Sequence, residues 1–144
     1  MAIRRIDSLG YQLGVVTRAY DRRLMAALAA LGVAPGQFPA LMMLYEKDGL
    51  TQADLCRRIG VEQPTMANTL KRMERDGLIR RSDDDGDKRR SFIHLTDKAR
   101  AIQADVVGAA RNVGASAVRK LSPGEQDHLF ALLAKLNDNL TTGE

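Results

Sequence analysis

Residues 51–96 read TQADLCRRIGVEQPTMANTLKRMERDGLIRRSDDDGDKRRSFIHLT and carry the strongest structural signals in this chain. Thr51 and Asp54 have the spacing of a capping box, so a short helix is expected to begin there. Gly60 indicates where this helix ends, because glycine adopts the left-handed backbone that often follows a helix. Pro64 suits the first turn of a second helix. The predicted order is therefore a short helix, a tight turn and a second helix.

The second helix has two chemically different faces. Met66, Leu70 and Met73 recur at steps of three and four residues, which predicts a buried apolar stripe. The opposite face carries amide, hydroxyl and cationic groups, namely Gln63, Thr65, Asn68, Thr69, Lys71, Arg72 and Arg75. Such groups are the ones that bind base edges and phosphates. The face is therefore predicted to contact DNA.

A charged hairpin is expected after this helix. Segments 78–81 and 91–95 have the composition of strands, and residues 82–90 between them are rich in Gly and Asp, which favours a long loop. The loop places acids on its outgoing side and three consecutive bases on its return, Lys88, Arg89 and Arg90. Asp87 can orient Arg89 by a bidentate bond for insertion into a minor groove. A run of charges that only contacts solvent is the alternative.

The chain resembles the MarR (multiple antibiotic resistance regulator) family of bacterial transcription factors over nearly its whole length. The matching residues are Leu50, Thr51, Gln52, Asp54, Leu55, Leu70, Arg72, Met73, Glu74, Gly77, Leu78, Ile79, Arg81, Asp84, Asp87, Lys88, Arg89, Leu95 and Thr96. The resemblance implies a ligand-responsive homodimeric repressor that binds a pseudo-palindromic operator. Its recognition helix would span about 63–76 and its wing about 82–91. Thr51, Gln52 and Pro64 join the predicted DNA-binding set.

Helical patterns dominate outside this region. Apolar residues recur from Ile6 to Leu31, between Pro35 and Gly49, from 97 to 118 and from 122 to 140, with a capping box at Ser122. The predicted fold is mainly α with a small β-hairpin wing. It is a winged helix–turn–helix, assigned to residues 35–96, with dimerisation helices in residues 1–34 and 97–144. The final helix is apolar on several sides, which favours a homodimer; folding back over the winged region is the alternative.

Relatives in the family commonly bind small aromatic or lipophilic anions between the dimerisation helices and the winged region. Here the resemblance implies aromatic, thioether and cationic side chains as an effector site: Tyr11, Arg18, Tyr20, Phe38, Met42 and Tyr45. Ordinary core packing is the alternative for these positions.

Composition excludes several function classes. The net charge of +4 is modest for 144 residues, so a DNA-binding face has to be made by arrangement rather than by bulk charge. The N-terminus lacks the apolar segment of a signal peptide, and no stretch is long enough to span a bilayer. Cys56 is the single cysteine, is expected in the core, and fits a reducing cytoplasm.

A catalytic or metal centre is not expected. His94 and His128 are the two histidines, and no carboxylate pair, phosphate loop or Cys/His metal spacing accompanies them. We therefore predict no enzyme activity, no cofactor and no metal, and double-stranded DNA as the main partner. Two other classes remain, a winged helix used only for protein contacts and a small helical enzyme. Loss of duplex affinity with rising salt would identify the DNA binder.

Overall fold

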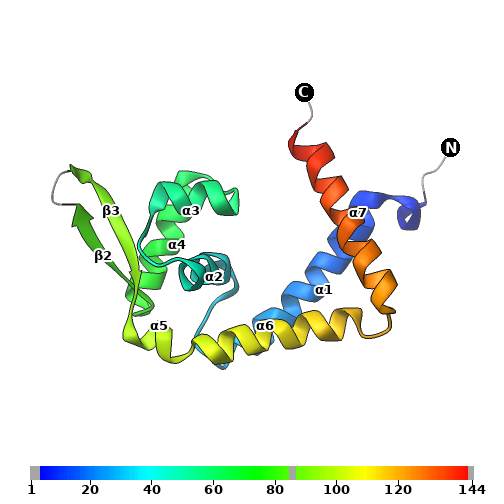
Figure 1. Cartoon of the computed structure of the whole chain (residues 1–144), viewed down its shortest axis with the longest axis horizontal. Helices are drawn as coiled ribbons and strands as arrows, with labels where there is room; N and C mark the ends of the chain where they lie inside the picture. Colours follow the sequence, from blue (N-terminus) through cyan, green and yellow to red (C-terminus); the bar gives the residue numbers. More distant parts are fainter. Residues whose placement is uncertain (1–3, 85–86, 143–144) are drawn as a thin grey trace. The chain divides into compact units, whose positions relative to one another are not determined.

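The computed structural model describes residues 4–84 and 87–142, and the side chains of residues 84–90 lie outside that description. The described chain is mostly helical with one small antiparallel sheet, as predicted (Figure 1). Its elements are η1 (Arg5–Asp7), α1 (Leu9–Ala29), η2 (Pro35–Gln37), α2 (Phe38–Glu46), β1 (Leu50–Thr51), α3 (Gln52–Ile59), α4 (Gln63–Arg75), β2 (Ile79–Asp84), β3 (Asp87–Leu95), α5 (Asp97–Ala101), α6 (Gln103–Val118) and α7 (Pro123–Thr141).

The chain divides into two compact units. The first is Met1–Ala110 and holds everything from α1 to the first half of α6. The second is Arg111–Glu144 and holds the rest of α6 and α7. The capping box predicted for α7 is present, because Ser122 Oγ accepts a hydrogen bond from the Glu125 backbone N–H and the Glu125 carboxylate accepts one from the Ser122 N–H.

The hairpin differs from the predicted long loop. The strands run further than expected, since β2 reaches Asp84 and β3 begins at Asp87, and these two residues are paired. The register shifts between Asp83 and Asp84. The charged side chains favour a loop in the sequence, but strand pairing uses backbone groups that every residue here possesses. β3 is the middle strand in the order β1–β3–β2.

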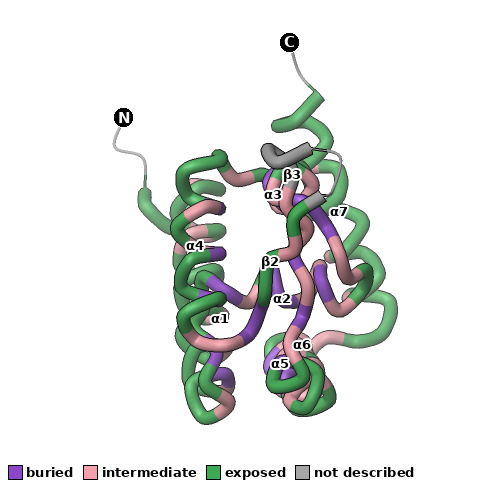
Figure 2. The backbone as a smooth tube through the Cα atoms, turned by 90° about the vertical axis from the view of Figure 1, so that its left-hand side faces the viewer, coloured by how far each residue is buried: buried purple, intermediate pink, exposed green. Residues whose placement is uncertain are grey.

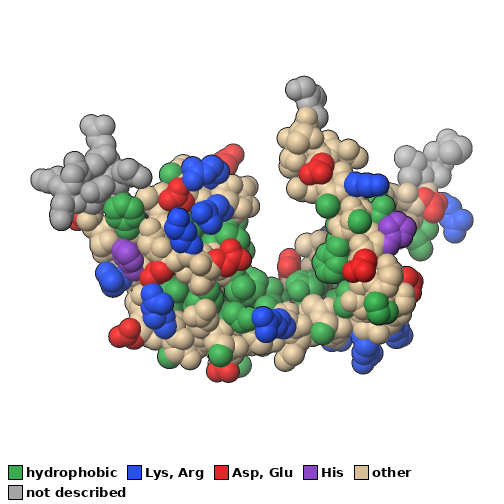
Figure 3. All heavy atoms as spheres, viewed as in Figure 1, with side chains coloured by type: hydrophobic (Ala, Val, Ile, Leu, Met, Phe, Trp, Pro, Cys, Tyr) green, Lys and Arg blue, Asp and Glu red, His purple; other side chains and the backbone are tan. Residues whose placement is uncertain are grey.

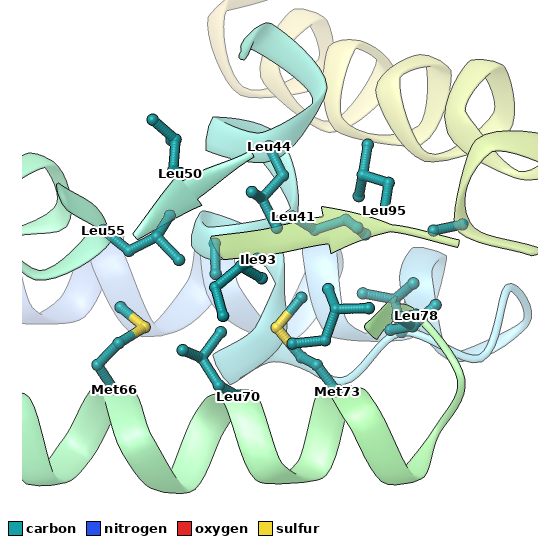
Figure 4. Close-up of a cluster of buried hydrophobic side chains, with 14 of the residues drawn as sticks. Leu41, Leu44, Leu50, Leu55, Met66, Leu70, Met73, Leu78, Ile93 and Leu95 are labelled. Carbon is teal, nitrogen blue, oxygen red and sulfur yellow. The ribbon is translucent and has the colours of Figure 1, made fainter. Parts of the chain in front are cut away.

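The core of the first unit lies between the helices and the sheet. Figure 4 shows Met66, Leu70 and Met73 of α4 pointing toward Ile93 on β3, with Leu41 and other residues of neighbouring elements around them. All of these side chains are buried. The apolar stripe predicted for the second helix of the motif is therefore confirmed.

Two predicted helices have different limits in the structure. The first helix begins at Leu9 rather than near Ile6, because the Ser8 hydroxyl accepts a hydrogen bond from the Tyr11 backbone N–H and serves as its N-cap. The helix expected over 97–118 is interrupted at Ile102, which separates α5 from α6. No glycine or proline stands at this position. Instead, Ile102 packs against the core cluster, so the interruption lies at a tertiary contact.

Two helices present apolar side chains to solvent in the single chain. On α1 only Leu28 is buried, while Leu9, Leu13 and Val16 are exposed. Among the described residues of α7 none is buried. Its exposed apolar side chains are Phe130, Leu132, Leu133 and Leu140. Large exposed apolar surface of this kind usually marks an interaction site.

Candidate nucleic-acid interface

The first helix of the motif is fixed at both ends. Thr51 Oγ1 accepts a hydrogen bond from the Asp54 N–H at 3.1 Å, and the Asp54 carboxylate accepts one from the Thr51 N–H at 3.1 Å. Gly60 has φ +77°, the left-handed conformation predicted for the helix end. Thr51, included among the predicted DNA-binding residues, is buried and its hydroxyl is already used as this cap. Gln52, the first residue of α3, is half-buried.

The polar face predicted for α4 is open to solvent. Figure 2 shows exposed and buried segments alternating along α4, as expected for a helix with one side against the core. The exposed residues are Gln63, Pro64, Thr65, Asn68, Lys71, Arg72 and Arg75, whereas Thr69 is half-buried. Arg75 forms an ion pair with Asp76, with its Nε 3.0 Å from Oδ1. Within the described residues Lys71 and Arg72 form no ion pair, so both cations are available to a phosphate.

The end of α4 is tied to neighbouring segments. Gln37 is buried and its amide nitrogen donates to Asp76 Oδ2 at 2.8 Å. Bonding from Arg75, and next from Gln37, lowers the pKa of the Asp76 carboxyl. Lys98 Nζ donates to the Asp76 backbone carbonyl at 2.7 Å. These contacts hold the C-terminal end of the helix in place relative to η2 and α5.

The base of the hairpin is anchored by Asp48. Its carboxylate accepts hydrogen bonds from the Leu95 backbone N–H at 2.9 Å and from the Arg100 guanidinium at 2.5 Å. His94, on β3, lies with its Nε2 2.9 Å from Ser82 Oγ of β2. The predicted wing residues Asp87, Lys88, Arg89 and Arg90 belong to β3 by their backbone, while their side chains lie outside the described part of the structure.

A cleft lies between the helices of the motif and the wing. It has a volume of about 430 Å³ and is lined by Thr51, Gln52, Ala53, Asp54, Arg57, Gln63 and Ser91. Four of these residues, Ala53, Asp54, Arg57 and Ser91, are not among the predicted DNA-binding residues. Arg57 is 72% exposed and pairs with Asp54 at 2.6 Å. In the sequence, Arg57 follows Asp54 by three residues, and this spacing indicates that the two side chains share a helix face. No feature of the sequence indicates Ser91.

Basic and acidic side chains are interspersed on this part of the surface. In the view of Figure 3, Lys and Arg side chains lie beside Asp and Glu over the winged region rather than in one continuous basic patch. This distribution agrees with the modest net charge of +4. Affinity for a polyanion therefore depends on which cations face it.

The residues predicted to bind an effector have different surroundings in the structure. Tyr11 and Arg18 are exposed, and Tyr20 is half-buried. Phe38, Met42 and Tyr45 pack against the core cluster, and the Tyr45 hydroxyl donates to the Ala99 carbonyl at 2.7 Å. Burial raises the pKa of Tyr45. A different cleft of about 680 Å³ is lined by Arg22, Met25, Ala26, Ala29, Gly32, Val33, Ala34, Pro35 and Asp76.

The remaining candidate groups have ordinary structural surroundings. Cys56 is a buried free thiol, as predicted. His128 is exposed on α7. Within residues 4–84 and 87–142, no cluster of three or more His, Cys, Asp or Glu side chains could hold a metal ion. None of the helices in the described part is long and apolar enough to cross a membrane.

Asp54→Ala is expected to lower the free energy of unfolding by about 1 kcal/mol near neutral pH, the usual contribution of such a cap. The Thr51 backbone N–H, followed by the Thr51 hydroxyl and Arg57, lowers the pKa of Asp54 to about 2. A carboxylate whose pKa is lowered by folding stabilises the protein above its unfolded pKa of about 4, and this contribution disappears as the pH falls toward the folded value. The difference between the two proteins should therefore shrink below about pH 4.

Urea unfolding followed by circular dichroism at several pH values measures this difference. Asp127→Ala is the control, because Asp127 is exposed on α7 and belongs to no capping box. It should change stability by less than about 0.5 kcal/mol. A constant difference between Asp54→Ala and wild type from neutral pH down to about pH 3 would show that the carboxylate charge does not stabilise α3.

The geometry defines a winged helix–turn–helix: two helices joined by a tight turn, followed by a two-stranded wing, with a polar and cationic helix face exposed beside it. The MarR family model matches residues 31–90. A probable transcriptional regulator from Pseudomonas aeruginosa has a similar structure, with 32% identity, a TM-score of 0.85, and coverage of 92% of this chain and 99% of that one. The chain belongs to the MarR family.

Two further solved structures are similar to this chain. A MarR-family transcriptional regulator from Silicibacter pomeroyi is 29% identical, with a TM-score of 0.77 and coverage of 99% of this chain and 96% of that one. MepR from S. aureus, solved in a complex with DNA, is 26% identical, with a TM-score of 0.86 and coverage of 92% and 98%. The family and the fold are therefore those of transcriptional regulators.

Proposed function

We propose that this chain is a non-catalytic, sequence-specific DNA-binding repressor that acts as a homodimer on a pseudo-palindromic operator. The observation that carries the proposal is the two-sided α4. Met66, Leu70 and Met73 anchor it in the core, while its exposed amide, hydroxyl and cationic side chains face solvent. A helix held in this way can enter a major groove without losing its own packing.

The exposed apolar residues of α1 and α7 support the homodimer. Phe130 is 64% exposed and Leu133 is 41% exposed in the single chain. A two-fold partner that covers such residues would present two copies of α4 about one helical turn of DNA apart, which matches the symmetry of a pseudo-palindrome. In this proposal residues 1–34 and 97–144 supply dimer contacts, and residues 35–96 bind DNA.

Release by a small aromatic or lipophilic effector is the regulatory part of the proposal and is supported by the family resemblance. Tyr11, Arg18 and Tyr20 remain the candidates on α1, since they are exposed or half-buried. Tyr45 already uses its hydroxyl in the bond to Ala99. Titration of the DNA complex with salicylate, as an aromatic anion, would detect release through a loss of fluorescence anisotropy.

Fluorescence anisotropy with labelled duplex across a salt series tests DNA binding directly. Affinity should fall steeply as salt rises, because each phosphate contact releases a counterion. Arg72→Ala should weaken binding to every duplex and lower the slope of log affinity against log salt by about one unit. Lys71→Ala should behave similarly.

Arg119→Ala is the matched control for this experiment. Arg119 is exposed directly after the end of α6, so its replacement removes the same charge far along the sequence from the motif. The control should keep the wild-type slope. Equal slopes for wild type, Arg72→Ala and Lys71→Ala would show that these two cations of α4 do not contact phosphates. An affinity that does not depend on salt would contradict DNA binding itself.

A further inference from the structure

A side-chain hydrogen bond connects the first residues of the two motif helices. Gln52 Nε2 donates to Gln63 Oε1 at 2.9 Å. Gln52 opens α3 and Gln63 opens α4, and both line the cleft that Ser91 of the wing also borders. The bond spans the turn between the helices and plays no part in capping α3, which Thr51 and Asp54 already cap. It therefore restrains the Gln63 amide specifically.

The restraint leaves a defined set of hydrogen-bonding groups on Gln63. A carboxamide oxygen has two lone pairs and its nitrogen has two N–H donors. With one lone pair engaged by Gln52, an acceptor and adjacent donors remain on the exposed end of the side chain. Adenine presents the complementary pair in the major groove, an N6 donor beside an N7 acceptor. Guanine presents two acceptors there and cannot pair with the amide oxygen.

We propose that Gln63 reads one adenine in each half-site and that Gln52 is a positioning residue that orients the Gln63 amide for this contact. The inference rests on the proposed function and adds a base preference to it. Gln52 is suited to positioning because its backbone directly follows the buried Thr51 cap, so its side chain starts from a fixed point. Gln63 is exposed and without this bond would sample several rotamers.

Selection of binding sites from random duplex DNA, followed by sequencing, tests this assignment. Wild type should prefer adenine at one position of each half-site by roughly ten- to hundredfold over the other bases, the range of a bidentate contact. Gln63→Ala should lose this preference and retain the preferences at other positions. Its salt slope should equal that of wild type, because no charge is removed.

Gln52 is tested with a matched pair of variants. Gln52→Leu has similar size but no donor, so the adenine preference should weaken several-fold. Gln52→Lys can donate to the same Gln63 oxygen and should keep the preference better than Gln52→Leu, even though its added charge raises overall affinity. Preference rather than affinity is therefore the measured quantity. Thermal unfolding by circular dichroism verifies that every variant is folded.

The outcomes separate this inference from the proposed function. A wild-type protein that selects no sequence contradicts the proposed function and the inference with it. If the wild-type protein selects a palindrome and the Gln63→Ala variant keeps every base preference, then Gln63 does not read a base. The proposed function is not contradicted by that outcome. Equal adenine preference for Gln52→Leu and Gln52→Lys contradicts the positioning role of Gln52.

Discussion

Leu133→Asp is expected to convert the protein into a monomer and to lower its affinity for a full operator by orders of magnitude. Leu133 lies on α7, where no described residue is buried in the single chain. In the proposed dimer this side chain becomes buried, and an unpaired buried charge costs several kcal/mol. A monomer offers one recognition helix and one wing, hence about half the phosphate contacts and no half-site register.

Sedimentation and gel-shift measurements on the same samples test this expectation. Ala131→Asp is the control, because Ala131 is exposed and lies two residues before Leu133, so the same charge is added on the opposite face of α7. The control should remain dimeric and bind like wild type. A Leu133→Asp variant that is clearly monomeric and still binds the full operator tightly would contradict the dimer-based mechanism, and a wild-type protein that sediments as a monomer would do so directly.

Arg89→Ala is expected to weaken operator binding by roughly ten- to hundredfold, the range for one specific arginine contact. Arg89 belongs to β3, whose base is held by the bonds of Asp48 to Leu95 and Arg100. A hairpin anchored in this way can present its tip to a minor groove adjacent to the groove that α4 occupies, where arginine is favoured electrostatically. Asp87→Ala should produce a smaller loss through poorer orientation of Arg89.

Arg80→Ala is the matched control, since Arg80 is an exposed arginine on β2 opposite His94, at the base of the same hairpin. It removes the same charge from the wing but not from its tip, and it should weaken binding much less. Anisotropy titrations on one operator compare the three variants. If Arg89→Ala and Arg80→Ala weaken binding equally, the loss of affinity comes from removing a positive charge anywhere on the wing. It then gives no support to insertion of the tip into a groove.

Local signals predicted most of the motif correctly. The capping box at Thr51, the left-handed Gly60 and the proline in the first turn of α4 are all present. The stripe of Met66, Leu70 and Met73 is buried as its spacing predicts. Such features depend on residues within about one or two helical turns, and a sequence contains that information directly.

The structure differs from the local prediction where distant backbone or side-chain contacts override local preference. The hairpin was predicted to have a nine-residue loop, at 82–90, because Asp and Gly favour turns. In the structure Asp84 pairs with Asp87, since strand pairing satisfies backbone groups whatever the side chain. The helix break at Ile102 coincides in the same way with a tertiary contact, because Ile102 packs against the core cluster. The start of α1 at Leu9 has a local cause instead, the Ser8 cap.

By itself, the sequence determined the identity and limits of the two motif helices, which face of α4 is buried, and the family to which the chain belongs. Only the tertiary structure decided which side chains meet. The bonds of Gln52 to Gln63, Gln37 to Asp76 and Asp48 to Arg100 join residues 11, 39 and 52 positions apart. Helical periodicity relates residues only three or four positions apart, whereas these contacts depend on how separate elements pack around the shared core.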